Sequence, residues 1–316
     1  MHEHSRGAVD TDRMSDERPD LMGKRFDRVA TEQLLDELAL PETDGDEYWE
    51  RVRCLHTRGG RDVFKLALEA LNGPDGLYRR AGADVLSQLG YKEDKPFTDE
   101  TIPHLLDRLR DSTEPEALVG ILGALGHLGF GYGEAFDENR RIALPWLRQL
   151  RTHYDDAVRE ALVAALNSAV NGPDELSIEA ALLLCELTRD QARDVRDWAT
   201  FWLEELPTMF DLDLPEVRRA LWQRVTDEDQ EIRVQAISGL ANHGDRSVIP
   251  ILIKEIELEA KDVETNDGLV WLNVFEAAKT FADPALLPAL RVMESALQVR
   301  ERLNWCEEAI EACRGV

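Results

Sequence analysis

Cysteine is scarce in this sequence, and the spacing of the cysteines argues against both a disulfide framework and a structural metal site. The 316 residues include four cysteines, Cys54, Cys185, Cys306 and Cys313, with no C-x-x-C pair. Four cysteines cannot frame a chain of this length with disulfides. Cys306 and Cys313 share a helix face, but they have no His or Cys neighbours to complete a zinc site. We therefore expect reduced, packed thiols and no structural metal.

Long apolar runs are missing as well. No stretch approaches the roughly 20 residues needed to cross a bilayer. Residues 1–20 also lack the apolar segment of a secretory signal. These absences predict a cytoplasmic protein with no membrane partner.

Positive charge is in short supply. The chain has 37 Lys and Arg residues against 63 Asp and Glu residues, so its net charge is -26. This charge opposes the approach of phosphate groups and disfavours nucleic acid and anionic lipid as partners. An acidic surface can also reflect a salty cytoplasm or a GC-rich genome, so the charge alone does not identify a basic partner.

What the sequence does contain is helical periodicity. Apolar residues recur at helical spacing, as in Val217, Leu221 and Val225, and no convincing period-two strand pattern interrupts them. Turns rich in Asn, Gly, Pro and Asp, such as residues 72–75 and 171–174, separate the helices. Their glycines can end one helix and their aspartates can cap the next. The chain is predicted to be all-α.

A short pattern recurs along the chain, namely an aliphatic residue, Pro, any residue and an apolar residue. Its prolines are Pro103, Pro145, Pro215, Pro250 and Pro288. Proline is tolerated in the first helical turn, where its missing N–H has no intrahelical partner, so the pattern predicts five helix starts. Degenerate copies at residues 63–66 and 178–181 bring the markers to seven, spaced 34 to 42 residues apart.

A second pattern lies upstream of the markers, an aliphatic or aromatic residue followed by Arg, with Leu seven residues after the Arg. Its arginines are Arg79, Arg159, Arg196 and Arg233. Alternating V-R-x-x-A-x-x-x-L and I-P-x-L helices resemble HEAT repeats, notably the short type related to phycobilisome lyases, over residues 46–300. Gly82 and Leu162 depart from this pattern, because Ala is usual at their positions.

The resemblance implies an all-α fold, an alpha-alpha superhelix or HEAT-like solenoid of about seven helix pairs. A lone amphipathic pair cannot bury its apolar stripe, so pairs stack and the ends of the stack need caps. We expect a disordered acidic tail at 1–22, an N-terminal capping helix within 23–44, the repeat array at 45–300 and a C-terminal capping helix at 301–316.

The repeated arginines have a structural interpretation. In the family that the chain resembles, such arginines pair with acidic groups of neighbouring repeats. Asp156, Asp194 and Asp229 stand close to them in this sequence. We favour this role over an anion-binding ladder.

Repeats two and three carry insertions between their helices. Leu86 lies 17 residues before Pro103, and Leu125 lies 20 residues before Pro145, against 10 to 13 residues in repeats four to seven. The insertions contain aromatic residues, namely Tyr91, Phe97, Phe130, Tyr132 and Phe136. Exposed aromatic rings indicate a partner site, for which Phe130 and Tyr132 are the candidates. The alternative is that the rings fold back and fill their own loops.

The second helix of each pair opposes the overall charge. Together the five proline-marked second helices hold 11 basic and 7 acidic residues. The candidate partner-binding residues on them are Arg108, Arg110, Trp146, Arg148, Arg151, Arg218, Arg219 and Trp222. Because second helices line the concave face of such arrays, this face could bind an acidic peptide or a phosphate-bearing ligand. Neighbouring acidic residues could equally neutralise it.

The predicted function is a non-enzymatic scaffold or adaptor that binds another protein or peptide through its concave face and the loops of repeats two and three. We identify no catalytic residue and expect no cofactor. The alternative is a HEAT-like enzyme acting on a modified nucleobase or tetrapyrrole, similar to DNA glycosylases or bilin lyases. Asp197, Trp198, Trp202 and Trp222 are compatible with the glycosylase form. The oligomeric state stays open.

Overall fold

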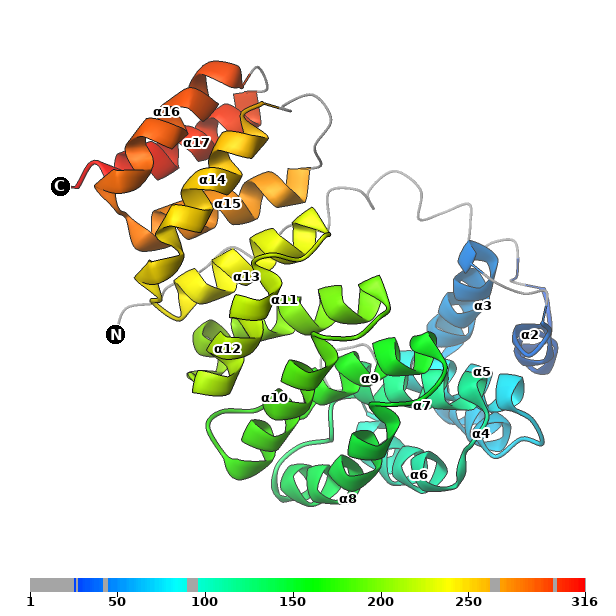
Figure 1. The fold of residues 1–316 in the computed structure, drawn as a ribbon. Coiled ribbons are helices and arrows are strands. Elements are labelled where there is room, and N and C mark those ends of the chain that lie inside the picture. The colour runs from blue at the N-terminus through cyan, green and yellow to red at the C-terminus, as the bar shows by residue number, and fades with distance from the viewer. Residues whose placement is uncertain are drawn as a thin grey trace, which may run out of the picture. The chain divides into compact units, whose positions relative to one another are not determined.

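The computed structural model describes residue 26 and residues 28–41, 45–89, 96–261, 268–297 and 300–315, and within these it is all-helical (Figure 1). The expected tail at 1–22 and Tyr91 lie outside the described residues. The helices are α2 Thr31–Leu38, α3 Gly45–Arg58, α4 Gly60–Leu71, α5 Gly76–Gln88, α6 Thr98–Asp111, α7 Pro115–Leu128, α8 Glu134–Leu150, α9 Asp156–Ser168, α10 Glu175–Leu187, α11 Arg193–Phe210, α12 Pro215–Arg224, α13 Gln230–Asn242, α14 Ile249–Glu259, α15 Gly268–Phe281, α16 Leu287–Ala296 and α17 Arg300–Cys313. Short 3-10 turns at Arg246–Val248 and Pro284–Leu286 precede α14 and α16.

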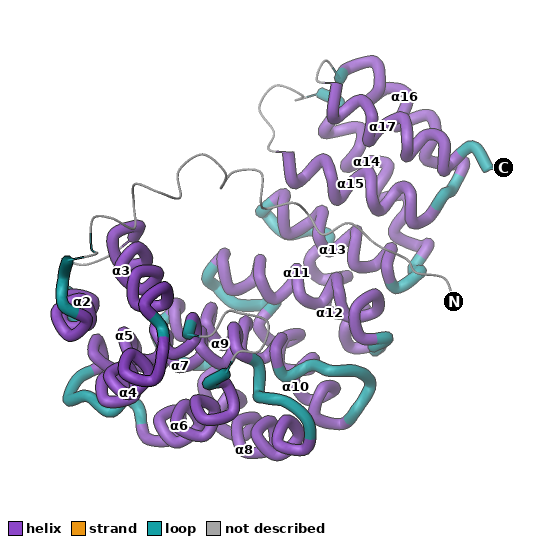
Figure 2. Tube along the Cα trace, turned by 180° about the vertical axis from the view of Figure 1, so that it is seen from behind, coloured by secondary structure: helices purple, strands orange, loops and turns teal. Residues whose placement is uncertain are grey.

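The chain forms two compact units, residues 1–124 and 125–316, and the boundary falls within α7. In the first unit α4 packs against α5, and α2 contacts α3, α4 and α5. In the second unit the helices form two layers (Figure 2). The first layer contains α9, α11, α13, α15 and α17, in which each helix contacts the next. The second layer contains α8, α10, α12, α14 and α16.

This order confirms the predicted helix pairs. The pairs run from α3–α4 to α15–α16 in the described part of the chain, which makes seven, with α2 before them and α17 after them. Apolar residues explain the first-layer packing. On α11, Val195, Ala199 and Leu203 recur at every fourth position and are all buried.

Two of the predicted helix starts were wrong. Pro215, Pro250 and Pro288 do lie in the first turn of their helices. Pro103 and Pro145 instead lie inside α6 and α8, because the insertions of repeats two and three add helical turns before them. The carbonyl groups that these prolines leave without a donor belong to Asp99 and Arg141, which are exposed, so water can satisfy them.

Local sequence explains the other helix ends. Asp75 and Asp174 accept hydrogen bonds from the first backbone N–H groups of α5 and α10, as their turns predict. Gly82 has a packing reason, because a Cβ there would lie 2.3 Å from the backbone nitrogen of Leu71. The departure from Ala at this position therefore allows α4 and α5 to approach closely.

Three of the four repeated arginines join successive repeats, and the fourth, Arg233, joins the two helices of its own repeat. Arg159 of α9 donates to both carboxylate oxygens of Asp190, at 2.7 and 2.8 Å, and Arg196 of α11 pairs with Asp227 at 3.2 Å. Arg79 pairs with Glu114 and Arg233 with Glu255 in the same way. Each arginine also donates to the carbonyl oxygen six residues before it. The structural interpretation is confirmed.

The acidic partners differ from the aspartates that lie nearest in the sequence. They stand in the second half of each repeat or just beyond it, 22 to 35 residues after their arginines, rather than at Asp156, Asp194 and Asp229. Asp229 instead caps α13 and pairs with Arg193. Neighbours in space are separated by a repeat length in sequence, so proximity along the chain did not identify them.

Replacing Arg159 with Leu should lower the free energy of unfolding by about 3–5 kcal/mol, because it leaves the buried Asp190 carboxylate without its guanidinium. Arg148→Leu should cost less than about 1 kcal/mol, since its pair with Glu179 is exposed. Urea unfolding followed by circular dichroism measures both. Equal losses of unfolding free energy in the two variants would show that the buried pair contributes no more to stability than the exposed pair.

Candidate functional site

The second-helix arginines of the first unit have acidic partners within their own helix. Arg108 pairs with Asp111 at 3.3 Å, and Arg110 pairs with Asp111 at 3.1 Å and with Asp107 at 3.7 Å. All these pairs connect neighbouring or adjacent-turn residues of α6. The two arginines therefore present paired rather than free charge.

In the second unit the arginines pair with residues of another helix or of the preceding loop. Arg148 of α8 and Arg151 at its C-cap pair with Glu179 and Glu186 of α10, each at 2.7 Å. Arg218 donates to Asp213 from its Nε at 2.8 Å. Arg219 is exposed and has no ion-pair partner among the described residues.

The two tryptophans of this set are half-buried. Trp146 lies on α8 and Trp222 on α12. The indole Nε1 of Trp222 donates to Asp245 at 2.8 Å, which satisfies the one polar group of that ring. Trp222 thus already has a structural contact that ties α12 to the turn before α14.

The two aromatic candidates of repeat three differ sharply in their exposure to solvent. Phe130 is 0% exposed and fills its own loop, as the alternative interpretation predicts, while its carbonyl oxygen accepts from Asn139 at 2.9 Å. Tyr132, two residues later, is 56% exposed. Glycines with positive φ at 129, 131 and 133 make this alternation possible, because each lets the chain turn between the two rings.

Arg140, a residue that sequence reasoning missed, fixes the start of α8 beside this loop. Its side chain is 2% exposed and donates to the Ala169 carbonyl oxygen, to Ser177 and to Asp174. Its guanidinium also lies over the Phe136 ring, 4.4 Å from the ring centroid. The arginine therefore ties α8 to the loop that joins α9 and α10.

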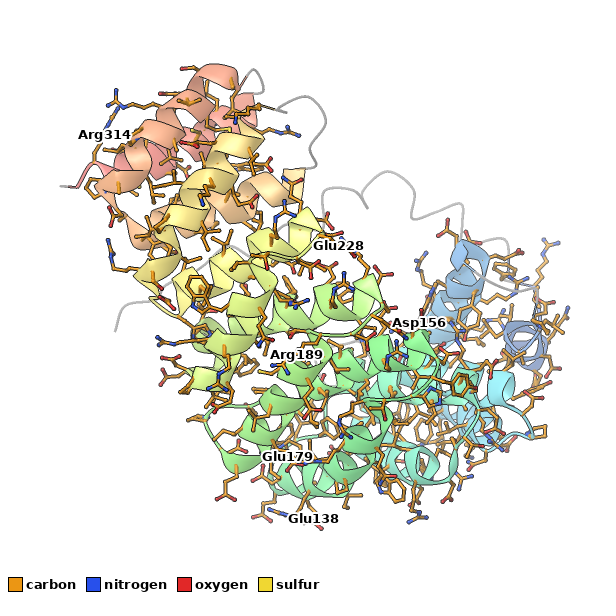
Figure 3. The ribbon with its side chains drawn as sticks, in the orientation of Figure 1. Glu138, Asp156, Glu179, Arg189, Glu228 and Arg314 are labelled. Carbon is orange, nitrogen blue, oxygen red and sulfur yellow. The ribbon has the colours of Figure 1, made fainter. Side chains whose placement is uncertain are left out.

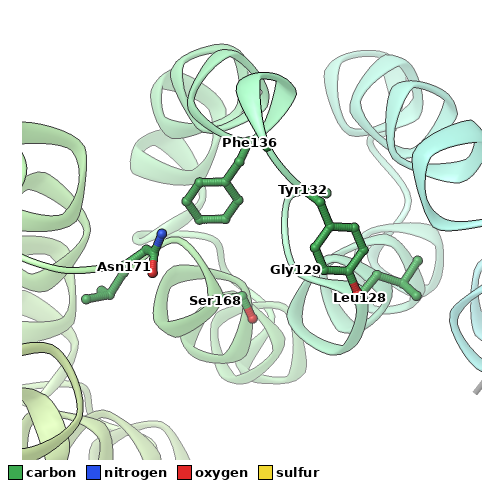
Figure 4. Close-up of a pocket in the computed structure, with 9 residues that line it drawn as sticks. Leu128, Gly129, Tyr132, Phe136, Ser168 and Asn171 are labelled. Carbon is green, nitrogen blue, oxygen red and sulfur yellow. The ribbon is translucent and has the colours of Figure 1, made fainter. Parts of the chain in front are cut away.

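These contacts frame an open pocket of about 500 Å³, which we call the loop pocket. It is lined by Leu128, Gly129, Gly131, Tyr132, Gly133, Phe136, Ser168, Val170 and Asn171. Figure 4 shows the Tyr132 and Phe136 rings on two sides of it, with Ser168 and Asn171 below. Its residues come from the end of α7, the loop and first turn of α8 that follow, and the segment from the end of α9 into the next loop.

The lining of the loop pocket consists mainly of glycine, apolar and aromatic residues. Its lining holds no carboxylate, imidazole or thiol. The Ser168 hydroxyl is already engaged with the Gly126 carbonyl oxygen at 2.6 Å. Two aromatic walls and exposed backbone can hold an apolar or aromatic side chain of a partner.

A second open pocket differs from the loop pocket in its lining. It lies beside Tyr154 and is lined by Asp155, Asp156 and Arg159, but by no tryptophan. Tryptophan lines neither of these two pockets. Among the described residues there is also no cluster of three side chains that could hold a metal ion.

Another group that the sequence did not reveal is Glu204 of α11. It is 5% exposed, and its Oε2 atom has no hydrogen-bond partner in the described structure. Burial raises the pKa of its carboxyl to about 8, although a hydrogen bond with Ser238 of α13 acts in the opposite direction. Helical spacing alone marks position 204 only as a residue near the core, so no sequence signal distinguishes it from a solvated glutamate.

The raised pKa makes a stability prediction. The folded state keeps the Glu204 proton up to about pH 8, whereas the unfolded chain releases it near pH 4.5, so stability falls as the pH rises between these values. Glu204→Gln removes this penalty, which grows by about 1.4 kcal/mol for each pH unit in that window. The variant should gain unfolding free energy over the wild type between pH 5 and pH 8.5 in urea titrations. A difference that stays constant across this range would contradict a neutral buried carboxyl.

Comparison with known proteins adds the fold relatives. No family model matches this chain. Protein YibA of Escherichia coli K12 is 27% identical over 247 residues, which cover 77% of this chain and 78% of YibA. The X-ray structure of YibA aligns with 98% of this chain and 99% of its own, with a TM-score of 0.66 and 18% identity.

Larger repeat proteins are similar as well. Importin beta aligns with 89% of this chain and 43% of its own, with a TM-score of 0.57 and 12% identity. Kap95p, in its complex with RanGDP, gives a TM-score of 0.52 with 14% identity over 89% of this chain and 41% of its own. The fold is a HEAT-like array of helix pairs. Among the described residues, no helix has both the length and the apolar character to span a membrane.

Proposed function

We propose that this protein is a non-enzymatic scaffold that binds another protein or a peptide, and that the loop pocket is its primary binding site. The observation that carries the proposal is the exposed Tyr132 ring, held opposite Phe136 by a glycine-rich loop that the buried Phe130 anchors. A large exposed ring on a fixed loop is a typical binding anchor. Kap95p, whose fold is similar, binds RanGDP, which is consistent with this role.

The finer classification belongs to the same proposal. The alternating V-R and I-P patterns support assigning the chain to the short HEAT repeats related to phycobilisome lyases, and the positions of α2 and α17 at the two ends of the array support their role as capping helices.

Tyr132→Ala should abolish capture of the partner without unfolding the chain, because the ring is exposed and contributes little to the core. Ile142→Ala is the matched control, since Ile142 is another exposed apolar residue of the same unit, on α8. The measurement is affinity capture from the native organism with the immobilised full-length chain, followed by mass spectrometry. A protein retained by wild type and control but lost with Tyr132→Ala supports the site. The same proteins on all three columns would contradict it.

The second-helix arginines form a proposed secondary contact. Arg148, Arg151 and Arg218 are in exposed ion pairs worth less than about 1 kcal/mol each, so an acidic partner could replace their carboxylates at small cost. Arg219 is exposed without such a partner among the described residues. It is therefore the arginine of this set best placed to gain from a partner carboxylate.

Arg219→Glu should weaken binding of the captured partner about tenfold while leaving the unfolding free energy within about 0.5 kcal/mol of wild type. Arg291→Glu on α16 makes the same charge change at another exposed position. Titration of the purified partner, monitored by calorimetry, gives both affinities. If the two variants bind alike, the second-helix surface around Arg219 is not part of the interface.

A further inference from the structure

The outward face of α11 carries an aromatic stripe between acidic ends. Asp194, Trp198, Phe201 and Glu205 follow one another at spacings of four, three and four residues, so they share one face of the helix. Trp198 is 46% exposed. Its ring meets Phe201 edge-on at 5.8 Å, and Phe201 meets Trp202 at 5.0 Å. A solvated helix face has no need of three such rings.

Carboxylates surround this stripe on both neighbouring helices. On α9, Glu160 lies near Asp194 and Asp156. Burial, followed by the charges of these two aspartates, raises the pKa of Glu160. On the other side, α13 contributes Glu231. Asp229 is the N-cap residue of α13, and Glu228 precedes it in the chain. Figure 3 shows Asp156 and Glu228 at the same end of the first-layer helices.

The protein supplies little positive charge of its own here. Arg193 pairs with Asp194, Asp197, Asp229 and Glu231, so one guanidinium is shared among four carboxylates. The nearby Arg159 and Arg196 are buried against Asp190 and Asp227. The face therefore keeps an excess of negative charge after its internal pairs are formed.

Several aromatic rings elsewhere in the chain have an arginine guanidinium over the ring face. Arg61 lies over Phe64 and Phe97, Arg140 over Phe136 and Arg246 over Phe281. Among the described residues no guanidinium or ammonium group lies over Trp198, Phe201 or Trp202. Tryptophan is the ring that attracts cations most strongly, so the most favourable cation–π position of this face is open.

We propose that the face formed by Asp194, Trp198, Phe201 and Glu205 of α11, with Glu160 of α9, binds a segment of another protein that carries Lys or Arg side chains. Two cationic groups would pair with the carboxylates at the ends of the stripe. An apolar residue or a third cation would lie on Trp198. Nucleic acid and anionic lipid do not fit, because both would bring phosphates against carboxylates.

The test uses a fluorescein-labelled peptide of four Arg-Gly-Leu repeats, with a Glu-Gly-Leu peptide as the comparison, titrated with the full-length chain and followed by fluorescence anisotropy. Trp198→Ala should weaken binding of the arginine peptide about tenfold. Glu160→Gln combined with Asp194→Asn should do the same. The control pair Glu216→Gln with Glu257→Gln removes the same charge from exposed positions of α12 and α14, and should change the affinity less than about twofold. The Glu-Gly-Leu peptide should not bind.

Two results would overturn the inference. Equal weakening by the two charge pairs would mean that the net charge of -26 attracts the peptide diffusely. Unchanged binding by Trp198→Ala would remove the aromatic stripe from the interface. Circular dichroism of each variant verifies that the substitutions leave the fold intact. The inference rests on the proposed binding role but fails separately from it, since the Tyr132 capture experiment does not depend on α11.

Discussion

The interaction on which the rest of the structure depends is the arginine link between successive repeats. Arg159 binds the Asp190 carboxylate, and the Asp190 carbonyl oxygen accepts from Arg196, which in turn binds Asp227. The Asp227 carbonyl oxygen then accepts from Arg233. Each aspartate thus uses its side chain for the repeat before and its backbone for the repeat after. The planar guanidinium of Arg159 binds the carboxylate through two parallel N–H bonds and still donates to a carbonyl oxygen, a geometry that the single ammonium nitrogen of lysine cannot reproduce.

This link helps to explain how the acidic chain divides its charge. Arginines at the repeat positions, such as Arg159 and Arg196, form ion pairs within the array. Arg140 is likewise buried beside Phe136. These pairs remove positive and negative charges in equal number, so the net charge of -26 is carried by the residues outside them. It becomes informative about a partner only where exposed aromatic rings accompany it, as at Trp198.

The repeat pattern predicted the fold well because its signals are local. Val195, Arg196, Ala199 and Leu203 occupy fixed positions on one helix, and the arginine makes the same kind of ion pair in repeats two, four, five and six. Pro215 begins its helix, as a proline should, but Pro145 does not, because inserted residues extended α8 backwards. A proline marks the start of a helix only when the residues before that proline do not form helical turns themselves.

The binding surfaces could be predicted only in part, because exposure depends on contacts between distant residues. Phe130 and Tyr132 are two residues apart in a glycine-rich loop, and the sequence alone does not say which ring points inward. The hydrogen bond from Asn139 to the Phe130 carbonyl oxygen and the position of Arg140 decide it. The same holds for Arg148, which reads as free charge until Glu179 is found one helix away. In a repeat protein, the sequence of each repeat specifies the core, whereas the exposed surface depends on contacts between repeats. Function has to be inferred from that surface.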